Sequence, residues 1–176
     1  MRYILLLGLM IGSSLLASSL VFVKGKVIAH TEVFGDNKID PKTSSIFSKL
    51  TIDKDILSIR GEVDVSLIDL KSDNDSRDEH MHEVLGSSTY TKTTFTIKDV
   101  KKVSTAYEVH GTLNLHGVTK ELVLKGNIVR VGNQVRLVLK NSFLMSDFGI
   151  EAPVMAFVLK VRDQVDISID TTYEIK

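Results

Sequence analysis

Cysteine is absent from the 176 residues of this chain. That absence excludes disulfide bonds, zinc–thiolate centres, a cysteine nucleophile and the lipidated cysteine of a bacterial lipoprotein. An excess of charge is absent as well, because 22 Lys and Arg residues balance 22 Asp and Glu residues. A nucleic-acid-binding protein normally carries a basic excess or a basic stripe. We therefore predict no nucleic-acid partner, and a single domain whose stability comes from packing and strand pairing.

The N-terminal residues differ in character from the rest of the chain. Met1-Arg2 is followed by an uncharged run from Ile4 to Val23, which includes the small residues Ala17-Ser18-Ser19. A basic start, an apolar run and small residues are typical of a secretory signal peptide. We predict a signal peptide over residues 1–19 and a folded domain over residues 20–176, outside the cytoplasm. The alternative is an uncleaved anchor, because the uncharged run is about long enough to span a bilayer.

Beyond Lys24, apolar and polar residues alternate along most of the chain. A period of two is the pattern of β-strands with one dry face and one wet face. Turn signals such as Gly132-Asn133 separate the runs. The pattern predicts an all-β antiparallel meander, which either closes into a barrel or splits into a sandwich. The apolar rows start and end at Val27 and Val33, Ile59 and Leu67, Phe95 and Ile97, Tyr107 and Leu115, Val135 and Leu139, and Val165 and Tyr173.

The charged segment from Lys71 to Gly86 breaks this alternation and predicts a loop followed by one short helix. Ser76 and Glu79 have the spacing of a capping box, and Gly86 is placed to end the helix. An apolar helix face would dock on the barrel. That face consists of Met81, Val84 and Leu85.

The same segment contains a cluster of metal-ligand types, Asp78 to Glu83. On a helix, His80 and His82 point about 200° apart, so they cannot share a metal ion. We predict a solvated helix without a metal, in which Arg77 and Asp78 pair with nearby loops. Two alternatives stay open: a metal-dependent hydrolase built on this cluster, and an interaction module that docks through residues 71–83.

His116-Gly117 lies between two alternating runs and is predicted to form a hairpin turn, with glycine accepting a positive φ. A catalytic histidine needs a nucleophile and an orienting acid beside it, and the sequence contains no nucleophile motif. We therefore predict no catalytic residue.

Several short motifs occur in a fixed order along the chain. They are R-D-E-H-M at residues 77–81, T-F at 94–95, Y-x-V-x-G-x-L-x-L-H-G-V-T-K at 107–120, S-D-F-G-I at 146–150 and V-D-I-S-I at 165–169. In this order and spacing, from about Gly61 to Ile175, the sequence resembles the YceI-like family of periplasmic polyisoprenoid-binding proteins. The start differs, because K-G-K-V-I-A-H-T-E-V-F-G replaces the family's usual H-S-x-V-x-F-x-V-x-H.

The resemblance implies an extended, lipocalin-like antiparallel β-barrel of about eight strands with one short helix, exported to the periplasm. It also implies an apolar tunnel that binds an isoprenoid chain such as a polyprenyl phosphate or a quinone tail, with no cofactor and no catalytic residue. A homodimer and transient contact with a membrane are further expectations.

Slim inward residues (Gly61, Gly111, Ala29) and an aromatic content of only 6% favour a hollow interior, and a packed barrel is the alternative. The predicted lining consists of Val63, Val65, Phe95, Ile97, Val109, Leu113, Leu115, Ile167 and Ile169. A mouth is predicted at Met145, Phe148 and Phe157, with a charged head group near Arg77 or Lys120.

Overall fold

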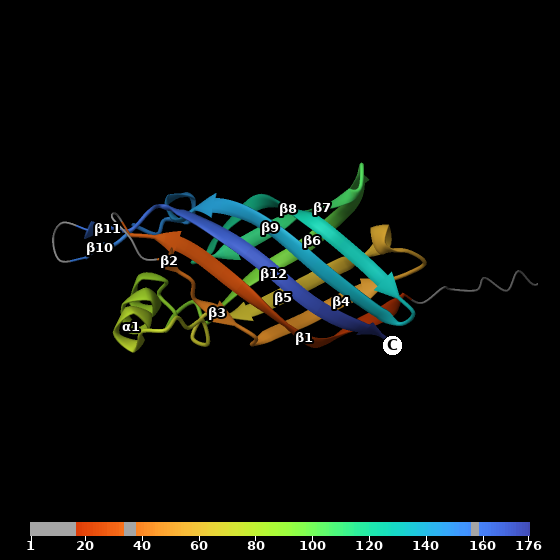
Figure 1. Cartoon of the computed structure of the whole chain (residues 1–176), viewed down its shortest axis with the longest axis horizontal. Coiled ribbons are helices and arrows are strands. Elements are labelled where there is room, and N and C mark those ends of the chain that lie inside the picture. The colour runs from red at the N-terminus through yellow and green to blue at the C-terminus, as the bar shows by residue number, and fades with distance from the viewer. Residues whose placement is uncertain (1–16, 34–37, 156–158) are drawn as a thin grey trace, which may run out of the picture.

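Eight long antiparallel strands form a closed barrel in the computed structural model, which describes residues 17–33, 38–155 and 159–176 (Figure 1). Each strand pairs with its neighbour in the sheet, and the last strand pairs back onto the first, which closes the ring. The long strands are β1 (Ser18–Glu32), β4 (Ile46–Ile52), β5 (Arg60–Ser66), β6 (Lys92–Val103), β7 (Ala106–Leu115), β8 (Val118–Val131), β9 (Gln134–Leu144) and β12 (Gln164–Ile175). The predicted all-β, lipocalin-like barrel is confirmed.

The remaining elements are short. One α-helix, α1 (Asp75–Val84), and the hairpin of β10 (Val154–Met155) and β11 (Leu159–Lys160) lie at the same end of the barrel (Figure 1). Two single-turn 3₁₀ helices occur at η1 (Ile56–Ser58) and η2 (Met145–Phe148), and β2 (Lys38–Ile39) and β3 (Lys42–Thr43) pair with β1. The opposite end, where β12 finishes, is filled by apolar side chains such as Leu20, Ile52 and Val135.

Strand β1 begins at Ser18, earlier than the alternation beyond Lys24 indicated. Ser19 and Lys176 exchange two backbone hydrogen bonds of 2.9 Å, and Leu20 is buried. An anchor running as far as Val23 is therefore not compatible with the structure, because its last residues belong to the barrel. The predicted signal peptide falls mostly on residues 1–16, outside the described residues, and stays a prediction. No helix among the described residues is long and apolar enough to cross a membrane.

Helix α1 confirms the predicted short helix but corrects its start. The N-cap is Asn74, whose side-chain oxygen accepts a hydrogen bond of 2.9 Å from the backbone N–H of Arg77. The predicted capping box of Ser76 and Glu79 is wrong, since asparagine is as strong an N-cap and takes the third helical N–H itself. Gly86 follows the helix with a φ of 58°, as predicted for the residue that ends it.

The turn between β7 and β8 confirms the structural interpretation of His116. His116 and Gly117 have φ values of 53° and 77° and connect the paired residues Leu115 and Val118. Two consecutive positive φ values define the turn that suits a two-residue hairpin. The His116 ring lies 4.6 Å from the ring of Tyr90, so this histidine attaches the hairpin tip to the loop that follows α1.

Candidate ligand-binding cavity

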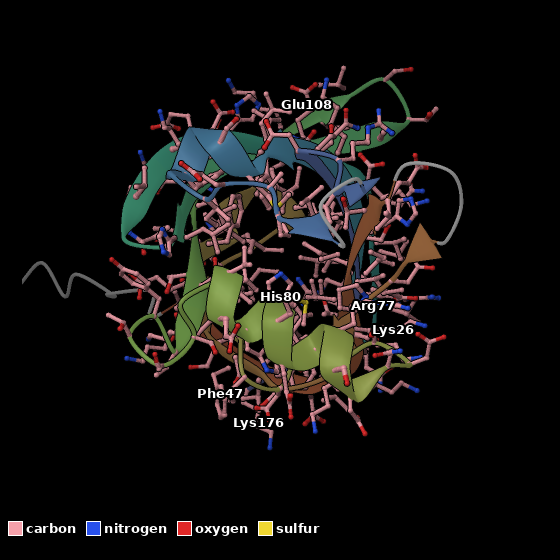
Figure 2. All side chains as sticks on the ribbon, turned by 90° about the vertical axis from the view of Figure 1, so that its left-hand side faces the viewer. Lys26, Phe47, Arg77, His80, Glu108 and Lys176 are labelled. Carbon is pink, nitrogen blue, oxygen red and sulfur yellow. The ribbon has the colours of Figure 1, made fainter. Side chains whose placement is uncertain are left out.

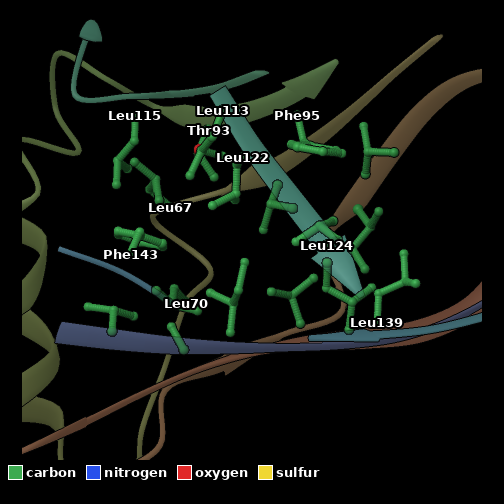
Figure 3. A pocket seen from close by; sticks show the side chains of 18 of the residues that line it. Leu67, Leu70, Thr93, Phe95, Leu113, Leu115, Leu122, Leu124, Leu139 and Phe143 are labelled. Carbon is green, nitrogen blue, oxygen red and sulfur yellow. The ribbon is translucent and has the colours of Figure 1, made fainter. Parts of the chain in front are cut away.

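A cavity of about 200 Å³ lies inside the barrel, towards the end that carries α1. One water molecule needs about 10–15 Å³ on this measure, so the space holds more than ten times that minimum. All eight long strands contribute to the wall, and Met81 and Leu85 of α1 reach it as well. Figure 3 shows the leucine and phenylalanine side chains that converge on the space.

The structure places all nine residues of the predicted lining on this cavity. They are Val63, Val65, Phe95, Ile97, Val109, Leu113, Leu115, Ile167 and Ile169. Alternation predicted them correctly because parity along a strand decides which face a side chain occupies. That they bind a ligand stays a prediction.

Sequence reasoning missed a second group of lining residues, mostly leucines. They are Leu67, Leu70, Leu122, Leu124, Leu137, Leu139 and Phe143. Cross-strand pairing provides the signal that would have found two of them: Leu122 pairs with Gly111 and Leu124 with Val109, and opposed residues share a face.

The slim glycines do not create the space, contrary to expectation. A side chain at Gly111 would strike the Thr96 carbonyl and would lie 2.7 Å from the tip of the Phe95 ring. At Gly61, whose φ is 119°, a side chain would strike the Lys49 carbonyl. Both glycines therefore permit close approach of neighbouring backbone, and Phe95 fills the position beside Gly111.

The predicted mouth residues behave differently from one another. Met145 lines the cavity, whereas Phe148 does not. Phe148 is only 1% exposed, and its ring packs edge-on against Phe143, which does line the cavity, with centroids 5.2 Å apart. The expectation that Phe148 contacts a ligand is corrected: it supports Phe143 from behind. Phe157 lies outside the described residues.

The charged segment around α1 is occupied by structural contacts. The buried Asp78 carboxylate accepts hydrogen bonds from the backbone N–H and the hydroxyl of Ser72, at 2.8 Å and 2.7 Å. The His82 ring bonds to the Leu70 carbonyl at 2.9 Å, and Arg77 pairs with Asp73 at 3.2 Å. No group of three potential metal ligands occurs in the part of the chain that the structure describes. This arrangement gives the metal-dependent hydrolase alternative no support.

Two cations lie near the α1 end. Figure 2 looks onto this end and labels Arg77 on the helix. Lys120 pairs with Leu113 across the β7–β8 hairpin and so belongs to the inward row of β8, yet it is exposed. Pairing of β8 with β9 begins only at Lys125, which leaves the two strands apart beside Lys120. Lys120 forms no ion pair with any described residue.

The architecture and the motifs are those of a known family. A model of the YceI-like domain matches residues 17–173. The chain belongs to the YceI-like family. None of the curated proteins compared with the sequence matches it.

Solved structures share this YceI-like barrel at low sequence identity. Burkholderia cenocepacia BcnA superposes with a TM-score of 0.73 at 13% identity, over 84% of this chain and 95% of that one. A polyisoprenoid binding domain from Saccharophagus degradans, implicated in plant cell wall breakdown, gives 0.68 at 16% identity, over 92% and 99%. A Campylobacter jejuni YceI protein gives 0.61 at 21% identity, over 74% and 81%. These likenesses establish a common fold.

Proposed function

We propose that this protein is an exported carrier that holds a long-chain isoprenoid lipid inside its barrel. The observation that carries the proposal is the cavity wall: all eight strands line one space, and no charged side chain is among its described lining residues. Burial of each methylene-sized unit of a lipid in such a space contributes about 0.8 kcal/mol. Family membership and the polyisoprenoid-binding domain among the structural neighbours support the same ligand class.

The dimensions of the wall suit a lipid chain. The lining row of β12 runs from Val165 to Tyr173, eight residue steps, or about 26 Å at roughly 3.3 Å per residue. A strand tilt of about 40° reduces this to about 20 Å along the barrel axis. One leaflet of a bilayer has about 15 Å of hydrocarbon, half of the roughly 30 Å core. A chain that fills one leaflet would therefore fit in the barrel along most of its length.

Delivery and location form the less direct part of the proposal. The barrel would act outside the inner membrane, in the periplasm, after removal of the N-terminal signal peptide. The end with α1 would receive the lipid from a membrane, and an anionic head group would lie beside Lys120 or Arg77. A homodimer and a transient membrane contact stay predictions, which size-exclusion chromatography and vesicle co-sedimentation would test.

The test of the carrier function is native mass spectrometry of the protein purified from its own host, followed by organic extraction. We expect a co-purifying species in the mass range of a polyprenyl lipid or a quinone. Leu113→Arg, which adds a charge to the wall, should abolish uptake of added prenyl lipid. Val129→Arg is the matched control, because Val129 is 53% exposed and faces outward. A clean apo mass together with no uptake by the wild type would refute the proposal.

A further inference from the structure

The otherwise apolar wall of the cavity contains three threonines, and they differ in one respect. Thr93 donates its hydroxyl hydrogen to the Asn114 carbonyl at 2.7 Å. Thr31 donates to the backbone carbonyls of Arg162 and Gln164, at 3.1 Å and 3.2 Å. The hydroxyl of Thr171 is buried and has no hydrogen-bond partner. Two of these hydroxyls are therefore satisfied by the protein itself, and one is not.

Thr171 stands in a row that is otherwise apolar or aromatic. The inward side of β12 reads Val165, Ile167, Ile169, Thr171 and Tyr173. Thr171 is 2% exposed, and its methyl group faces Gly25 of β1, where an added side chain would lie 2.9 Å from that methyl. Valine has nearly the same shape and would keep this packing without a buried hydroxyl. An unpaired buried hydroxyl is unfavourable, so its presence at this position points to a partner that the folded chain does not supply.

Tyr173 adds a second hydroxyl-bearing side chain at the same place. It lies two residues further along the same row, is 1% exposed, and marks the inner limit of the lining on β12, beside Val135 of the packed end. Burial raises the pKa of the Tyr173 phenol, and the neighbouring Thr171 hydroxyl opposes this only in part. The two hydroxyls are near each other but lack the geometry of a hydrogen bond, which leaves Thr171 unpaired. The phenol is neutral under physiological conditions, so this end of the cavity is polar without being charged.

We propose that Thr171, with Tyr173 beside it, forms a subsite at the inner end of the cavity for a neutral oxygen of the ligand. The hydroxyl of Thr171 donates a hydrogen bond to a quinone carbonyl or to the oxygen of a prenyl alcohol, and that oxygen enters the barrel first. A phosphate does not suit this end, since no cation lines the described part of the cavity to offset its burial. The inference rests on the proposed carrier function and selects neutral-headed isoprenoids over prenyl phosphates for this subsite.

The experiment compares Thr171→Val with the wild type for three probes that share one prenyl tail: a benzoquinone, the phosphate and the bare hydrocarbon. Affinity for the quinone should fall about fivefold to tenfold, the range expected for one neutral hydrogen bond. Affinity for the hydrocarbon should stay unchanged, and so should that for the phosphate. Thr171→Ser keeps the hydroxyl and should retain the wild-type ratio of quinone to hydrocarbon affinity.

Thr93→Val is the matched control, because it removes a lining hydroxyl that the protein already satisfies. Its quinone-to-hydrocarbon ratio should equal that of the wild type. Thr171→Val should also unfold at or above the wild-type melting temperature, since its hydroxyl loses no partner. An unchanged ratio in Thr171→Val, or a clear drop in its melting temperature, would overturn the subsite. If the wild type takes up none of the three probes, the carrier function itself fails.

Discussion

Two buried valines allow the hollow interior to be tested without any ligand. Val109 and Val135 are both 0% exposed and lie on neighbouring parts of the same barrel core. Val109 lines the cavity, whereas Val135 belongs to the packed end and does not. Enlarging both residues in the same way, as Val109→Phe and Val135→Phe, compares a wall that has space with a core that has none.

The two substitutions should differ clearly in stability. At Val135 the added ring meets a packed core, and overpacking should lower the free energy of unfolding by about 1–3 kcal/mol. At Val109 the ring enters a cavity of about 200 Å³, so the loss from strain is offset by burial of the ring. We expect a change of less than about 1 kcal/mol there, since each methylene-sized unit buried gains about 0.8 kcal/mol.

Urea denaturation followed by circular dichroism measures both free energies, and displacement of a fluorescent lipid measures uptake. In Val109→Phe the ring takes space that a lipid would use. Loss of about two methylene-sized contacts, roughly 1.6 kcal/mol, should weaken lipid binding by more than tenfold. Equal destabilisation of the two variants would refute a hollow interior at Val109. Full binding by a folded Val109→Phe would refute that part of the wall as the lipid site.

Two further predictions concern groups outside the cavity. Asp78→Ala removes the buried acceptor of the Ser72 N–H and hydroxyl, so unfolding in urea should be easier by about 2 kcal/mol and α1 amides should exchange faster; an unchanged midpoint would contradict this. Hydrogen bonds from Arg136 lower the pKa of Asp170 below its ordinary 3.8, so the stabilisation is present above about pH 4 and is lost as pH falls through the lowered value. Melting temperatures measured from neutral to acidic pH should therefore depend less on pH in Asp170→Asn, and identical profiles would argue against the pair.

The sequence was sufficient for the fold and for half of the wall because both depend on parity. Every residue of the predicted lining reached the cavity, since a strand that alternates has only two faces to choose between. Parity also explains the success at His116, where the strands on either side had to reverse within two residues. Events that depend on several neighbours were missed: the cap of α1 moved to Asn74, and Phe148 turned behind Phe143. Those choices are made by side-chain geometry that a single sequence does not encode in its period.

Whether a barrel is hollow is a question of volume, and here parity is not sufficient. Gly61 and Gly111 suggested empty space by their size, yet backbone carbonyls or the Phe95 ring occupy the positions where their side chains would lie. The cavity exists because facing rows of valine, leucine and isoleucine do not meet across the ring of strands near α1, whereas at the other end they do. The same reasoning applies to Thr171: its place in the inward row is visible in the sequence, but its lack of a partner follows from which carbonyls the register brings near. Specificity in such a barrel therefore depends on the few polar atoms that closure leaves unpaired, and apolar alternation only provides the container.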